Sequence, residues 1–212
     1  MNPLQANVGL GAALVGGPLG DDPVDVIKAI YQRRATRHFT DAEVPRSVVL
    51  DLIHAAAQAP SAMNQQPWAF GVFHGRERLA EYSERAKAHL LRTSDPPFGL
   101  DPRIDQYANT HFNIFHEANT LIVICAKPGR FSPIENCFLA AQNLMLAAHG
   151  WGLGTCPVGF ARAWFELPEI KAELGIPTPY TPVLPIVAGY PAQPPPAVLK
   201  QEPEIACWHW DE

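Results

Sequence analysis

The sequence has few cysteines, and none of them lies at a spacing typical of a metal or redox site. Its four cysteines, Cys125, Cys137, Cys156 and Cys207, are scattered, with no C-x-x-C pair and no histidines at zinc-ligand intervals. This distribution argues against a structural zinc site, and we expect no metal ligands. Scattered, reduced thiols are typical of a cytoplasmic protein, which is the localisation we expect.

The chain also lacks a basic excess and a long apolar run. It contains 16 Lys and Arg against 21 Asp and Glu, with a formal net charge of -5. Because nucleic-acid binding requires a strongly basic surface, no nucleic-acid partner is expected. No apolar tract is long enough to span a bilayer, and residues 1–20 contain no Lys or Arg for a secretory signal. We therefore expect no membrane partner and a flexible N-terminal tail over 1–20.

Two common catalytic signatures are missing. No G-x-S-x-G nucleophile elbow occurs, and the glycines of residues 150–159 lack the strand–turn–helix context of a dinucleotide fingerprint. With 212 residues, of which 47% are hydrophobic, the chain is long enough for one domain over 21–212.

Apolar periodicity predicts alternating helices and strands. A helix that begins near Pro23 ends at Arg33 and Arg34, and the other expected helices follow Pro45 and cover 76–91, 133–150 and 163–174. The expected strands are 68–74, 121–126 and 183–190. Residues 93–105, rich in proline, form a loop.

Two short motifs suggest a binding site. Arg33-Arg34-Ala35-Thr36-Arg37 places three guanidiniums within five residues, which suits a phosphorylated small molecule, although such a run can also be a solvated turn. The second motif, residues 59–68 (APSAMNQQPW), is a rigid loop that leads into an apolar strand.

Taken in order, three segments resemble the FMN-dependent nitroreductase family. They are RRATRHF, AAQAPSAMNQQPW and AAQNLMLAAHGWGLGTCPVG, and the resemblance covers about residues 22–210. It implies an α+β fold with a central, mostly antiparallel sheet flanked by helices. It also implies an intertwined homodimer, in which an extended C-terminal arm, residues 191–212, packs on the partner subunit.

The resemblance further implies that FMN binds at the subunit interface. Arg33 and Arg37 would contact the phosphate, ribityl chain or pyrimidine edge, with Arg34 close by. Ala35 stands where the family usually has serine, so one hydroxyl contact is absent unless Thr36 or water replaces it. The other implied contacts are Pro60, Ser61, Ala62 and Asn64 from the partner subunit, amides around Pro157, Val158 and Gly159 at flavin N5 and O4, and Lys200 at the phosphate.

The implied activity is ping-pong hydride transfer from NADH or NADPH, through FMN, to a nitroaromatic, a quinone or a similar electron-poor small molecule. The flavin carries this chemistry, so no catalytic acid or base is assigned. The alternatives are a specialised member (a reductive dehalogenase, an enone reductase or a flavin-destroying enzyme) and a non-catalytic FMN carrier or redox sensor. For the pyrimidine edge, residues 111–116 offer Asn113 and histidines. An aromatic residue expected near the substrate pocket is Phe98, Tyr107, Phe112 or Phe115.

Overall fold

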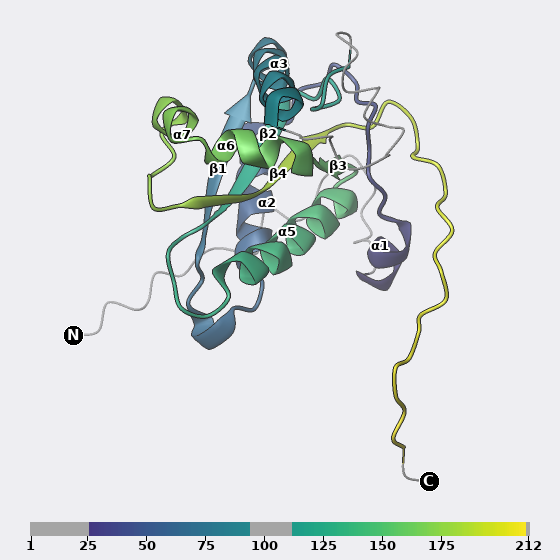
Figure 1. Cartoon of the computed structure of the whole chain (residues 1–212). Coiled ribbons are helices and arrows are strands. Elements are labelled where there is room, and N and C mark those ends of the chain that lie inside the picture. Colours follow the sequence, from purple (N-terminus) through teal and green to yellow (C-terminus); the bar gives the residue numbers. More distant parts are fainter. Residues whose placement is uncertain (1–25, 94–111, 211–212) are drawn as a thin grey trace, which may run out of the picture.

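A four-stranded antiparallel sheet lies at the centre of the molecule (Figure 1). The computed structural model describes residues 26–93 and 112–210. The strands are β1 (Trp68–His74), β2 (Thr120–Ala126), β3 (Gly154–Pro157) and β4 (Thr181–Gly189), in the order β1-β2-β4-β3. All three neighbouring pairs are antiparallel. The expected α+β class with a mostly antiparallel sheet is confirmed.

β2 is buried along its whole length, as its unbroken apolar sequence predicts. Because successive side chains point to opposite faces of a strand, β2 contributes to two separate cores. Ile122 and Ile124 pack with the first core, and Leu121 and Val123 pack with the second. The sheet therefore has an apolar layer on both faces.

Helices cover both faces of the sheet. α2 (Arg46–Ala57) and α5 (Pro133–Gly150) pack together on one face, where small buried residues such as Ala56, Ala140 and Ala148 let the two helices approach. α3 (Arg76–Thr93), α6 (Arg162–Glu166) and α7 (Pro168–Leu174) form the other layer. The bounds of α5 and of β1 are those that the sequence predicted.

The structure differs from the predictions at two points. The single helix expected over 163–174 is two helices, because Leu167 is extended (φ −60°, ψ 130°), as the residue before a proline prefers, and Pro168 begins α7. Of the four aromatic residues considered for a substrate pocket, Phe115 is instead fully buried in the core with residues of α3 and α6. Phe98, Tyr107 and most of the loop expected over 93–105 lie outside the described residues, as does the expected N-terminal tail.

Short helix α1 (Val26–Gln32) and the C-terminal arm lie at the edge of the molecule (Figure 1). Ile27, Ile30 and Tyr31 of α1 are exposed, and so are Trp208 and Trp210 near the end of the arm. The arm extends away from the rest of the chain, so its apolar side chains have little of their own subunit to cover them. Among the helices of the described ranges, none combines the length and the apolar character needed to cross a membrane.

Candidate functional site

The arginine motif is an extended segment fixed beside β3. The Thr36 N–H donates to Thr155 O at 2.9 Å, and Ala35 forms a parallel bridge with Thr155. Gly154 permits this approach, because a Cβ at that position would overlap the Thr36 side chain. The segment is therefore anchored to the sheet edge, which a freely solvated turn would not be.

Arg33 and Arg37 both lie close to the buried thiol of Cys156 on β3. Burial raises the pKa of Cys156, while the guanidinium of Arg37, and more weakly that of Arg33, acts to lower it. The charges of two of the three arginines thus reach Cys156, near the end of β3. The three residues that the sequence placed opposite the flavin, Pro157–Gly159, follow directly.

Within Pro157–Gly159, one backbone donor remains a good candidate. Pro157 has no N–H, and the N–H of Val158 already donates to Pro185 O at 2.8 Å. Gly159 is exposed, and a Cβ added there would meet nothing within 4 Å. The chain therefore leaves open space above Gly159.

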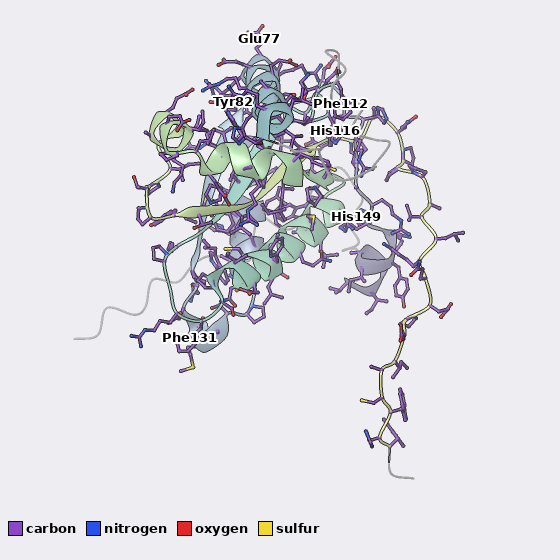
Figure 2. The ribbon with its side chains drawn as sticks, viewed as in Figure 1. Glu77, Tyr82, Phe112, His116, Phe131 and His149 are labelled. Atoms are coloured by element: carbon purple, nitrogen blue, oxygen red, sulfur yellow. The ribbon has the colours of Figure 1, made fainter. Side chains whose placement is uncertain are left out.

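His116 also lies near Arg37. Burial, the charge of Arg37 and that of His38 lower the pKa of His116 to about 4, so its imidazole is neutral at pH 7. His116 and Glu117 both have left-handed backbone (φ 55° and 57°), a strained geometry that is common at functional sites. The ring of Phe112 meets His116 edge to face (Figure 2), with centroids 6.0 Å apart.

Asn113, which was also considered for the pyrimidine edge, uses its side chain to stabilise the local turn. Its side-chain oxygen accepts a hydrogen bond from the N–H of Phe115 at 2.8 Å, which closes the turn that precedes β2. His116 is therefore the better-placed residue of this segment for contact with a ligand beside Arg37.

The loop over 60–66 has a strained backbone that hydrogen bonds hold in place. It contains the predicted contacts Pro60, Ser61, Ala62 and Asn64. Met63, Asn64 and Gln66 all have positive φ, between 47° and 53°. Ser61 Oγ accepts a hydrogen bond from the Gln66 N–H at 2.9 Å. The Ala62 N–H donates to Oδ1 of the buried Asn136, in the first turn of α5, at 3.3 Å. Such strain persists only where surrounding contacts fix it, as is typical of binding loops.

The loop and the arginines lie at opposite ends of α5. Asn136 anchors the loop at the start of the helix, whereas His149, which feels the charges of Arg33 and Arg34, lies in its last turn. The 13 steps along the helix from Asn136 to His149 correspond to about 20 Å at 1.5 Å per residue. Figure 2 shows Phe131, just before α5, and His149 at opposite ends of this helix. One chain alone does not bring the two halves of the expected site together.

A cavity of about 520 Å³ lies between the arginine motif and the start of the arm. We call it the Arg34 cavity. Within the described ranges it is lined by Gln32, Arg33, Arg34, Thr36, His149, residues 152–155 and residues 191–195. The sequence motifs did not indicate His149, Gln193 or residues 191–195 as part of a common site, because they are distant along the chain.

Arg34 is held at one wall of this cavity. Its Nη1 donates to the carbonyls of Tyr31 and Arg33, at 2.7 and 2.8 Å, at the C-terminal end of α1. Its Nε is buried and has no hydrogen-bond partner in the described part of the chain. Burial and the charges of Arg33 and Arg34 lower the pKa of His149.

Lys200 lies near neither the arginine motif nor the Pro60–Asn64 loop in this chain. It is exposed on the arm, beyond the residues that line the Arg34 cavity. Over the two ranges that the structure covers, no group of three or more His, Cys, Asp or Glu residues could hold a metal ion.

Comparison with known proteins identifies the family. The model of the nitroreductase family matches residues 30–190, well over half of the chain. The chain belongs to the nitroreductase family. The matched range contains the arginine motif, the loop after α2 and Pro157–Gly159, and it ends before the arm.

Relatives and solved structures agree with this membership. A protein of Methanothermobacter thermautotrophicus (strain Delta H), with the provisional name NADH dehydrogenase/NAD(P)H nitroreductase, is 30% identical over 178 residues, which cover 81% of this chain and 80% of that protein. The 4-nitrobenzoate reductase of Nocardioides sp. (strain LMS-CY) is 30% identical over 205 residues, covering 79% and 81%. A nitroreductase with bound FMN from Bacteroides fragilis NCTC 9343 superposes with a TM-score of 0.70 at 25% identity, covering 86% of this chain and 95% of that one.

Proposed function

We propose that this chain is an FMN-dependent oxidoreductase that uses NADH or NADPH to reduce nitroaromatic, quinone or similar electron-poor small molecules. The observation that carries the proposal is the extended segment with Arg33 and Arg37, which pairing with Thr155 fixes at the β3 edge and whose guanidiniums act on Cys156, the residue before Pro157–Gly159. Membership of the nitroreductase family, the FMN in the Bacteroides fragilis structure and the name of the Nocardioides relative support the cofactor and the substrate class.

The donor groups present fit FMN. Arg33 and Arg37 offer the charge and the planar forks that suit a phosphate or the anionic edge of a reduced flavin. The N–H of Gly159 would supply one hydrogen bond at the reactive edge of the ring, and His116, neutral at pH 7, would offer a donor or an acceptor beside Arg37. Ala35 offers no hydroxyl, so the arginines carry more of the binding here.

When bound, FMN supplies the hydride chemistry, and the protein binds, orients and shields it. Fixed guanidiniums stabilise negative charge without reorganisation, because the sheet already holds the segment in place. Buried Cys156 and Val158 exclude water from the β3 side of the site. No side chain is required as an acid or base in this proposal.

We further propose that a second copy of the chain completes the site. Asn136, which anchors the loop, and His149, which feels the charges of Arg33 and Arg34, are about 20 Å apart along α5 of one chain, so in this proposal another subunit places Pro60–Asn64 beside the arginines. Exposed apolar side chains on α1 and α5, and the two tryptophans of the arm, would be buried in such a dimer. The arm would then pack on the partner subunit, where Lys200 could reach a phosphate.

The test is spectroscopic and kinetic. Purified protein should be yellow, or take up FMN on addition, and should oxidise NADH or NADPH when a nitroaromatic or a quinone is supplied. Colourless protein that takes up no FMN and oxidises neither donor would overturn the proposal. Bound FMN without consumption of either donor, with any acceptor, would instead indicate an FMN carrier or redox sensor.

A further inference from the structure

The Arg34 cavity lies behind the proposed flavin site. In an extended segment, alternate side chains point to opposite faces, and Arg34 and Thr36 line the cavity whereas Ala35 and Arg37 do not. Pro157, Val158 and Gly159 are also outside its lining. Arg33 is the residue that both sites share, because it lines the cavity and also acts on Cys156.

The charge of the cavity favours an anion. Two guanidiniums line it, and none of the described lining residues is Asp or Glu. The two hydrogen bonds of the Arg34 guanidinium to its own segment use Nη1 only, so its positive charge is not paired with a carboxylate among the described lining residues. Thr36 and Gln193 add neutral polar groups.

The size and the walls of the cavity favour a small organic molecule over a bare ion. Its volume of about 520 Å³ lies within the range of small-molecule sites, roughly 300–1,000 Å³. Pro191, Pro194 and Pro195 at the start of the arm add apolar groups to the lining. This part of the arm is held in place, because the Ala192 N–H donates to His38 O at 3.0 Å and Phe39 bridges to Pro191.

We propose that the Arg34 cavity is a second ligand site, which binds a phosphate-bearing small molecule other than FMN. Its phosphate lies against the guanidiniums of Arg33 and Arg34, and its organic part lies against the prolines of the arm. The site does not depend on the proposed flavin chemistry, although Arg33 joins the two.

Calorimetric titration of the FMN-loaded protein with inorganic phosphate, in a buffer without phosphate, tests the site. The expected result is one phosphate bound per chain. Gln193→Glu, which adds a negative charge to the lining with little change of shape, should weaken phosphate binding about tenfold while FMN stays bound. Gln201→Glu adds the same charge further along the arm, outside the lining, and should leave the affinity unchanged. Arg34→Gln should abolish binding.

Three outcomes overturn the second site. The first is wild-type protein that binds no phosphate. The second is binding by flavin-free protein that disappears on loading with FMN, which would assign the cavity to the phosphate of FMN. The third is equal weakening by Gln193→Glu and Gln201→Glu, which would show a general effect of charge. If the protein takes up no FMN, the proposed function fails, and the same titrations on flavin-free protein still decide whether the cavity binds phosphate.

Discussion

Arg33 lies where the proposed flavin site and the Arg34 cavity meet. Arg33→Ala should weaken FMN binding by roughly 1.5–3 kcal/mol, because hydrogen bonds to charged groups contribute about that much. Fluorescence titration of flavin-free protein with FMN measures the change. Arg46→Ala, which removes an exposed guanidinium at the start of α2, should have no effect. Unchanged affinity after Arg33→Ala would remove Arg33 from the site.

Gly154 is the residue that lets the arginine segment approach β3. A Cβ there would overlap the side chain of the buried Thr36, so Gly154→Ala should destabilise the fold by roughly 1–3 kcal/mol, as overpacking does. The urea midpoint measures this loss. Gly150→Ala is the matched control, because a Cβ at Gly150 meets nothing within 4 Å and alanine is the better helix former. Equal midpoints for the two variants would contradict the close approach.

Site residues that are contiguous in the sequence can be predicted from it, whereas site residues that are far apart along the chain cannot. Arg33 and Arg37 were recognisable because they lie within one short motif. The contact between Thr36 and Gly154 joins residues more than a hundred positions apart, so only the folded chain reveals it. His149 and Gln193 are missed for the same reason. Phe115 was misplaced because a core and a substrate pocket both require aromatic side chains.

Helices α3 and α7 are joined by an ion pair that predicts a pH dependence of stability. Nη1 and Nη2 of Arg85 donate to the two carboxylate oxygens of Glu173, at 2.6 and 2.5 Å. Arg85 holds the pKa of Glu173 below its ordinary value of 4.5. The pair therefore stabilises the fold above that pH, and its contribution is lost as pH falls through the lower pKa of the folded state.

Glu173→Gln should accordingly lower the urea midpoint at pH 7, and its difference from the wild type should vanish in acid. The change should be modest, because the pair is partly exposed to solvent. Glu169→Gln on the same helix, which has an exposed carboxylate, controls for the change in net charge. A difference that persists unchanged at low pH would show that the ion pair is not its source.

Whole elements were predicted where a strong local pattern agrees with the packing. β1 and α5 have the predicted bounds because their apolar patterns are long and end at Gly75 and Gly150. The helix predicted over 163–174 divides at Pro168. This proline could have indicated the break, but the helical pattern on both sides of it favoured one continuous helix. β4 begins at Thr181, two residues before the predicted start, because its pairing with β2 continues past Pro182.

Across the whole molecule, the placement of the two half-sites could not be derived from periodicity. The sequence shows both motifs, but the distance between them depends on α5, whose two ends they occupy. The resemblance to nitroreductases supplied the expectation that they belong to different subunits. The fold agrees with that expectation, because Asn136, which anchors the loop, and His149, which feels the charges of Arg33 and Arg34, are about 20 Å apart along α5.

Complementation between two defective chains tests this division of the site. One chain carries Arg33→Ala with Arg37→Ala, and the other has Ser61–Gln66 replaced by a Gly/Ser segment of equal length. In a two-fold dimer that contains one copy of each chain, one site combines the mutated arginines with the replaced loop. The other site combines wild-type arginines with a wild-type loop. Co-expressed chains with different tags, purified through both tags, should therefore show about half of the wild-type FMN content and NAD(P)H oxidation per dimer.

Each defective chain alone should form dimers in which both sites lack one half, so neither should retain FMN. Tagged wild-type chains carried through the same purification set the full value. If each subunit formed its site from its own arginines and its own loop, the mixed dimer would contain two defective sites and would be as inactive as its parents. Recovery in the mixed dimer therefore requires that Pro60–Asn64 of one subunit lies beside Arg33 and Arg37 of the other.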